Sequence, residues 1–273
     1  MTDKISLAGD LGSGKSTVSN ILINELGAEY YSTGSIVRSL AQQHGMSITD
    51  FNAYMENHPE IDNMIDDGIS ALSEVDKLLI IDSRMAWHFT KGTFKVYLST
   101  DIETSALRIM NANRMGEHNA TLEETVAATR QRRASEQKRY MEQYGVDIKD
   151  LSNYSLIVDT TYASPEEVAA VIIEGFRLWQ NDKTRRFCYL APERLNYIDD
   201  APDADLIGRY SADMEEGRAV PEVTVYERDG EFYVESGLES ALAYAFNMHT
   251  FVPTTLIKGE IGDRKYVKMA NSI

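Results

Sequence analysis

A glycine-rich octapeptide near the N-terminus constrains the fold of this 273-residue chain more than any other feature. Residues 9–16 read Gly-Asp-Leu-Gly-Ser-Gly-Lys-Ser and satisfy the pattern G-x-x-x-x-G-K-[ST]. The apolar run before them predicts a buried strand over residues 4–8, and the residues that follow predict a helix over residues 15–26. A loop of this composition between a strand and a helix is a P-loop, whose backbone N–H groups and helix N-terminus bind phosphate. We therefore expect the chain to bind a nucleoside triphosphate.

Each residue type in the loop suits one part of a bound nucleotide. The glycines let the backbone wrap around an anion, because glycine adopts conformations that other residues avoid. Lys15 can reach the outer phosphates, and the Ser16 hydroxyl can take a position on Mg²⁺. The expected nucleotide-binding residues are Gly9, Gly12, Ser13, Gly14, Lys15, Ser16 and Thr17.

Predicted strands and helices alternate over the first two thirds of the chain. Apolar runs at residues 78–82, 94–98 and 156–159 predict strands of the kind that parallel sheets bury on both faces. The pattern of residues 122–144 predicts a long helix, ended by Gly145. Together these signals predict an α/β fold, a three-layer αβα P-loop domain with a parallel sheet, over residues 1–183.

The pattern changes after residue 179. A polar linker leads to two β-like runs, residues 223–226 and 231–235, which the Asp-Gly pair at residues 229–230 predicts to form a hairpin. Residues 240–246 predict a short helix and residues 251–257 another strand. We therefore expect a second, smaller α+β domain over residues 184–273.

Composition excludes several classes of function. The formal net charge is −16 at pH 7, whereas surfaces that bind nucleic acid are rich in Lys and Arg, so we expect no nucleic-acid partner. No apolar run approaches the roughly 20 residues that span a bilayer, so we expect no membrane association. The single cysteine, Cys188, excludes an internal disulfide. From these features together we expect a cytoplasmic protein.

Short stretches along residues 1–180 carry a family resemblance beyond the P-loop. They are residues 32–34 with Arg38, residues 51–62, 81–84, 132–140, 144–148, 154–160 and 164–168. In order and spacing they resemble the archaeal-type cytidylate kinases, a branch of the P-loop nucleoside monophosphate kinases.

The resemblance implies an activity, cofactors and a set of site residues. It implies phosphoryl transfer from ATP, with Mg²⁺, to a nucleoside monophosphate, most simply CMP or dCMP. The implied catalytic residues are Lys15, Asp82, Arg132 and Arg139, and the implied metal-binding residues are Ser16 and Asp82. The implied acceptor-binding residues are Thr33, Gly34, Arg38 and Arg84. Arg132 and Arg139 lie two helical turns apart and therefore share a face, as expected of a lid that closes on the transferred phosphoryl group.

Several positions, in two stretches, depart from the family pattern and leave the acceptor open. Ser83 stands where relatives usually carry Gly, and the run from Arg132 has Ala134 and an added Arg133. A P-loop kinase for a different small acceptor is therefore one alternative. A nucleotide-binding sensor that signals through the second domain is another.

The C-terminal residues loosely resemble the ParB/sulfiredoxin-like fold. Residues 189–195 resemble its opening strand and residues 221–234 its central hairpin. Gly237 remains from its Gly-His-His-Arg type motif, but residues 238–240 read Leu-Glu-Ser. We therefore expect this domain to have lost its own catalysis and to serve specificity, homodimerisation or binding of a protein partner.

Overall fold

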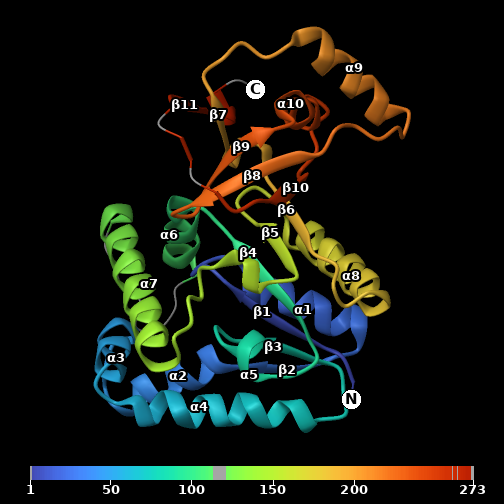
Figure 1. The fold of residues 1–273 in the computed structure, drawn as a ribbon. Coiled ribbons are helices and arrows are strands. Elements are labelled where there is room, and N and C mark those ends of the chain that lie inside the picture. The colour runs from blue at the N-terminus through green and yellow to red at the C-terminus, as the bar shows by residue number, and fades with distance from the viewer. Residues whose placement is uncertain (1, 113–120, 260, 263, 272–273) are drawn as a thin grey trace. The chain divides into compact units, whose positions relative to one another are not determined.

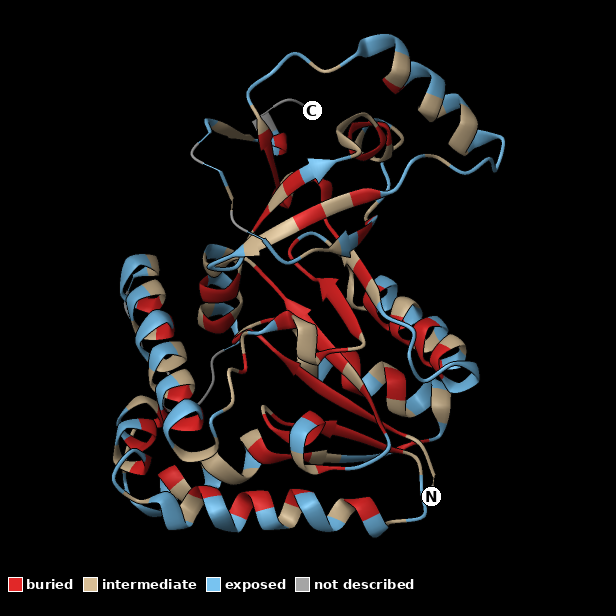
Figure 2. Cartoon of the chain, in the orientation of Figure 1, coloured by how far each residue is buried: buried red, intermediate tan, exposed pale blue. Residues whose placement is uncertain are grey.

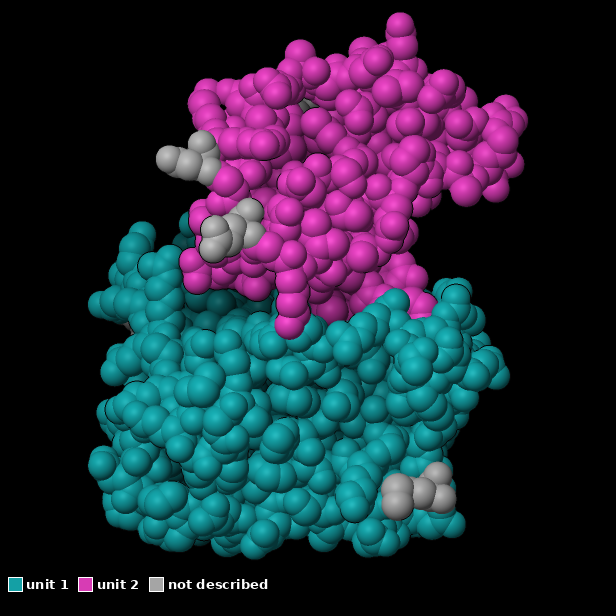
Figure 3. Space-filling model, viewed as in Figure 1, with its two compact units in different colours: residues 1–156, 164–186 teal, residues 157–163, 187–273 magenta. Residues whose placement is uncertain are grey.

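The computed structural model describes residues 2–112, 121–259, 261–262 and 264–271 (Figure 1). The chain forms two compact units, coloured separately in Figure 3: residues 1–156 with 164–186, and residues 157–163 with 187–273. Nothing within the described ranges has the length and hydropathy that a bilayer-spanning helix needs.

The first unit is built on parallel strands in the order β4-β1-β3-β2. Their bounds are β1 (Lys4–Gly9), β2 (Glu29–Ser32), β3 (Leu79–Asp82) and β4 (Thr93–Ser99). Every residue of β1 and β3 is buried, as Figure 2 shows, which is what a parallel sheet covered on both faces requires. The α/β fold with a parallel P-loop sheet is thus confirmed. Strand β5 (Leu156–Asp159) begins in this unit and continues into the second.

Helices cover this sheet, and those predicted over residues 15–26 and 122–144 are present. Their bounds are α1 (Lys15–Leu26), α2 (Thr33–Gln43), α3 (Ile48–Met55), α4 (Pro59–Ala71), α5 (Ala86–Phe89), α6 (Ile102–Asn111), α7 (Leu122–Tyr144) and α8 (Pro165–Asn181). The short 3₁₀ turn η1 (Leu72–Glu74) follows α4, and η2 (Leu151–Asn153) precedes β5. Helices α1 and α8 pack together, while α5 packs on β1 and β4 and contacts α4.

Local chemistry sets both ends of α7. The Thr121 side chain accepts a hydrogen bond from the Glu124 N–H, and the Glu124 carboxylate accepts one from the Thr121 N–H. This capping box satisfies two N–H groups that have no partner inside the helix. Gly145 ends the helix with φ 65°, a left-handed conformation that favours glycine. The predicted bounds of α7 are therefore confirmed.

An apolar cluster holds α2, α3 and α4 against the sheet. Phe51 and Met55 of α3, Ile69 of α4 and Ile81 of β3 are each at most 1% exposed. Because these helices are anchored beside the carboxyl end of β3, their polar faces are available to a site at that edge.

The second unit is a mixed sheet with two helices. Its strand order is β11-β7-β9-β8-β10-β6-β5, with antiparallel pairs at β8–β9, β6–β10 and β7–β11 and parallel pairs at β7–β9 and β8–β10. The bounds are β6 (Phe187–Leu190), η3 (Pro192–Arg194), β7 (Leu195–Ile198), α9 (Ala204–Glu215), β8 (Val223–Arg228), β9 (Glu231–Ser236), α10 (Leu238–Phe246), β10 (Val252–Leu256), β11 (Tyr266–Lys268) and η4 (Met269–Asn271).

Three features of the second unit bear on the sequence predictions. Asp229 and Gly230 form the turn of the β8–β9 hairpin with φ of 56° and 83°, so the predicted Asp-Gly turn is confirmed. Cys188 in β6 is buried, and burial raises the pKa of its thiol to about 12. Gly237 precedes α10 with φ 80°, and a Cβ there would lie 2.4 Å from the Glu222 carbonyl oxygen.

Candidate functional site

A pocket lies at the carboxyl edge of the parallel strands. Residues from the P-loop, α2, α3, α4, the end of β3 and α7 line it. The register explains this convergence, because Asp82 at the end of β3 is paired with Leu7 of β1 and Ser32 of β2. Parallel strands present their carboxyl ends at one edge, so the loops that follow them meet there.

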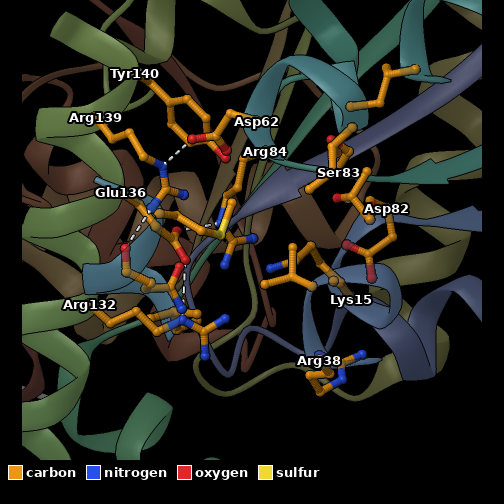
Figure 4. A pocket seen from close by; sticks show the side chains of 18 of the residues that line it. Lys15, Arg38, Asp62, Asp82, Ser83, Arg84, Arg132, Glu136, Arg139 and Tyr140 are labelled. Carbon is orange, nitrogen blue, oxygen red and sulfur yellow. Dashed lines mark hydrogen bonds and ion pairs between the residues drawn. The ribbon is translucent and has the colours of Figure 1, made fainter. Parts of the chain in front are cut away.

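Most of the predicted site residues lie together in this pocket, part of which Figure 4 shows. Those that line it are Gly12, Ser13, Gly14, Lys15, Ser16, Thr33, Gly34, Arg38, Asp82, Arg84, Arg132 and Arg139. Gly9 and Thr17 are not among the lining residues, and Thr17 is exposed. Gly9 has φ 138°, and a Cβ there would lie 2.3 Å from the Leu98 carbonyl oxygen, so close strand packing by itself requires glycine at this position.

The Lys15 ammonium group points back along the P-loop. Its Nζ donates to the carbonyl oxygens of Asp10 at 2.8 Å and Gly9 at 3.2 Å, and to the Ser13 hydroxyl at 3.3 Å. Burial, with the nearby positive charge of Arg84, lowers the pKa of Lys15 to about 7. Lys15 therefore lies in a place that favours a negatively charged ligand.

Glu136 of α7 is the counter-ion of two predicted arginines. Its carboxylate lies 2.8 Å from Nε of Arg84 and 3.2 Å from Nε of Arg132. Burial opposes ionisation of Glu136, but the two guanidinium groups outweigh it and lower the pKa of Glu136 to about 2. The pocket thus holds a fixed network of guanidinium groups around one carboxylate.

Arg139 joins α7 to the helices on the far side of the pocket. Its Nε lies 2.7 Å from Oδ2 of Asp62 in α4, and its Nη1 donates to the Asn52 carbonyl oxygen in α3 at 3.2 Å. Arg132, Glu136 and Arg139 all line the same pocket, so the prediction that Arg132 and Arg139 share a face is confirmed.

Two buried carboxylates on α4 form an acidic part of the pocket. Asp62 and Asp66 lie one turn apart, and Oδ2 of Asp66 accepts a hydrogen bond from the Tyr144 hydroxyl at 2.5 Å. Burial raises the pKa of Asp66 to about 6, although Tyr144 and Arg139 act against that rise. Sequence reasoning placed Asp62 in a family stretch but assigned neither carboxylate a role. Their four-residue spacing on a helix with apolar neighbours was the available signal.

Asp82 and Ser16 supply the kind of oxygen ligands that Mg²⁺ takes in proteins. Asp82 accepts a hydrogen bond from the Tyr30 hydroxyl at 3.1 Å, and its carbonyl oxygen accepts one from Thr33. Within the described ranges no group of three or more His, Cys, Asp or Glu side chains is placed to hold a metal. A nucleotide-bound Mg²⁺ takes one or two protein ligands and completes its shell with phosphate oxygens and water.

Comparison with known proteins points to nucleotide kinases. Residues 5–131 match a family model described as an AAA domain. A cytidylate kinase of Thermoplasma volcanium is 38% identical over 174 residues, which are 62% of this chain and 89% of that protein. A cytidylate kinase of Thermoplasma acidophilum is 35% identical over 173 residues, with the same shares. An S-adenosylmethionine-dependent nucleotide dehydratase of Lacinutrix mariniflava is 34% identical over 205 residues, 69% of this chain and 42% of that protein.

Proposed function

This chain belongs to the cytidylate kinase family of P-loop proteins, and we propose that it transfers a phosphoryl group from ATP to a nucleoside monophosphate, preferentially CMP or dCMP. One observation carries the proposal: Lys15 of the P-loop and the side chains of Arg38, Arg84 and Arg132 line the same pocket. Transfer between two anions requires positioning and neutralisation of charge, and this pocket offers cations from both sides.

The donor side is assigned to the P-loop. Its N–H groups and Lys15 would hold the phosphates of ATP, as the N-terminus of α1 favours negative charge. Ser16 would hold Mg²⁺ directly and Asp82 through water, and the bound ion would neutralise charge on the phosphate oxygens. Binding of an anion would also favour the charged form of Lys15.

The acceptor side is assigned to the start of α2 and the end of β3. Thr33, Gly34, Arg38 and Arg84 would bind the acceptor, with Arg38 as the guanidinium fork on its phosphate. Arg38 Nη2 lies 3.4 Å from the Ser35 hydroxyl, and a Cβ at Gly34 would come within 3.4 Å of Arg38 Nη1. A Cβ at position 34 would therefore meet the Arg38 side chain at an ordinary van der Waals distance. Arg132 and Arg139 would form the lid.

The two departures from the family pattern lie differently with respect to this pocket. Ser83 is buried, and its hydroxyl accepts a hydrogen bond from the Met85 N–H at 3.2 Å, so it stabilises the turn after β3. Ala134 is exposed on α7 and does not line the pocket. Ser83 itself lines the pocket whereas Ala134 does not, so of these two only the change at position 83 bears directly on the acceptor.

A second candidate is nucleotide binding without kinase turnover. The similarity to a protein named as a nucleotide dehydratase favours it, because the shared residues there belong to a protein not named as a kinase. In that case the chain would act as a sensor that signals through residues 184–273. We propose that these residues form a separate domain for a second copy or a protein partner, and its ParB/sulfiredoxin-like resemblance stays a prediction.

ADP release from Mg·ATP distinguishes the two candidates. The purified chain is assayed with CMP, dCMP, UMP, AMP, GMP and small alcohols, and we expect the highest kcat/KM with CMP or dCMP. Arg38→Ala should raise the acceptor KM about tenfold or more and leave the Kd of Mg·ADP unchanged. Nucleotide binding with no acceptor-dependent turnover across the panel would reject the kinase and leave the sensor.

A further inference from the structure

Asp10, the second residue of the P-loop, carries a buried carboxylate that does not line the pocket described above. It lines a second cavity, where it accepts hydrogen bonds from the Tyr97 hydroxyl and the Thr100 N–H, both at 3.0 Å. It also forms ion pairs with Lys149 and, at 3.6 Å, with Nη2 of Arg133 on α7. Burial opposes ionisation, but Lys149 and Arg133 outweigh it and lower the pKa of Asp10 to about 2. The carboxylate is thus held as an anion by groups outside the pocket.

Arg133 also reaches the next residues of the loop through Ser105 of α6. Arg133 Nη2 donates to the Ser105 hydroxyl at 3.3 Å, and that hydroxyl donates in turn to the Leu11 carbonyl oxygen. A Cβ at Gly12 would lie only 2.5 Å from the Ser105 carbonyl oxygen, so α6 and the loop are in close contact. One guanidinium group therefore contacts the P-loop directly at Asp10 and, through Ser105, at Leu11. We call the contacts of Arg133 and Lys149 with Asp10, together with the Ser105 link, the brace.

The main chain of Asp10 acts on the phosphate side of the same loop. Its carbonyl oxygen accepts hydrogen bonds from Lys15 Nζ at 2.8 Å, the Ser13 hydroxyl at 2.8 Å and the Ser13 N–H at 3.3 Å. The Asp10 side chain is thus bound by Arg133 of α7, while the Asp10 carbonyl oxygen is bound by Ser13 and Lys15, which are predicted to bind phosphate. A shift of the carboxylate would move the carbonyl group with it.

We propose that Arg133 and Lys149 are positioning residues for the donor nucleotide, which hold the P-loop in its phosphate-binding shape through Asp10 without touching the nucleotide. The inference rests on the proposed function only in placing a nucleotide at the P-loop. Groups fixed before the ligand arrives need no reorganisation when it binds, so loss of the brace weakens binding. Because α7 also carries Arg132 and Arg139, the brace couples the helix of the predicted lid to the donor site.

Asp10→Asn separates positioning from simple electrostatics. The substitution removes a negative charge near the site, so charge alone would make an anionic nucleotide bind more tightly. Loss of the brace would make it bind more weakly. The two explanations predict opposite signs for one measurement.

The test is calorimetric titration of the full chain with Mg·ADP, without acceptor, so that it does not depend on kinase turnover. We expect Arg133→Ala and Asp10→Asn each to raise Kd about tenfold, which is about 1.4 kcal/mol. The double variant should bind no more weakly than the worse single variant, because both remove the same contact. Arg130→Ala, which removes the same charge from an exposed position of α7, should stay within about twofold of the parent chain.

Three outcomes would each overturn the proposal. Asp10→Asn could bind Mg·ADP as tightly as the parent chain or more tightly, the effects could be additive in the double variant, or Arg130→Ala could have an equal effect. Lys149→Gln provides a variant less prone to misfolding, since the Lys149 side chain is 35% exposed. Its Kd should rise about threefold or more at a stoichiometry near one, and an unchanged Kd would count against the proposal. The titration stoichiometry reports the folded fraction, so a general loss of folding cannot imitate the expected rise in Kd.

Discussion

The carboxylate of Glu136 and the guanidinium group of Arg84 lie 2.8 Å apart, with side chains only 8% and 18% exposed. Glu136→Gln should remove the counter-ion of Arg84 and Arg132 and decrease the free energy of unfolding by about 3 kcal/mol. Because folding lowers the pKa of Glu136, its contribution is present above its unfolded pKa and is lost as pH falls towards about 2. Urea unfolding at pH 7 measures the change. Glu142→Gln, exposed on the same helix, is the control, and equal stabilities of the two variants would contradict the prediction.

Lys15→Met should separate function from stability. Burial and Arg84 disfavour the charged ammonium group in the folded chain, so its removal should leave the melting temperature unchanged or higher. Mg·ADP should bind about a hundredfold more weakly, because a charged partner of the phosphates is gone. Thermal unfolding without nucleotide measures the melting temperature, and calorimetric titration measures the Kd of Mg·ADP. A fall of several degrees in melting temperature would show that Lys15 stabilises the fold instead.

Asp66 should make stability depend on pH in the opposite sense to Glu136. Its pKa is raised to about 6 by burial and by the negative charge of Asp62, against Tyr144 and Arg139. The unfolded chain therefore loses this proton first, and the contribution of Asp66 to stability falls as pH rises from about 4 to about 6. Relative to the parent chain, Asp66→Asn should gain about 1–2 kcal/mol over that interval, after allowance for solvent screening. Urea unfolding at pH 4 and 7 tests this, with the exposed Asp67→Asn as the control that should gain much less, because Asp67 is the smallest of the effects on the pKa of Asp66.

Gly9 and Gly14 should respond differently to alanine, although both belong to the P-loop pattern. A Cβ at Gly9 would clash with Leu98, whereas a Cβ at Gly14 meets nothing within 4 Å. Gly9→Ala should decrease the free energy of unfolding by about 3 kcal/mol or more. Gly14→Ala, at φ 83°, should lose about 1 kcal/mol, with weaker Mg·ADP binding as its main effect. Thermal unfolding of both variants is the measurement, and similar losses would refute the distinction.

Elements with local signals could be predicted, and elements that depend on distant partners could not. Helix α7 has a capping box and a terminal glycine in its own sequence, so its bounds followed from residues 121–145. Strand β7 was missed because it is short and pairs with β9 and β11, far along the chain. Helix α9 was missed because Gly208 interrupts its helical pattern, although Asp203 caps its N-terminus, and it packs against α10.

The site divides in the same way. The P-loop is contiguous, so the amino-acid sequence alone relates its residue types to phosphate binding. The pairing of Glu136 with Arg84 joins residues 52 positions apart, and the role of Asp10 depends on Arg133 and Lys149. Such contacts form only when the chain folds, so they cannot be predicted from the spacing of residues within one segment.

The rate at which the buried Cys188 thiol is alkylated can be used to measure how often the second unit opens. Since the thiolate is the reactive form and the pKa is about 12, alkylating reagents react slowly while β6 stays packed. Alkylation therefore follows transient opening of this unit, whereas nucleotide titration reports on the first. The one cysteine of the chain thus lets the two units be followed separately in the same sample.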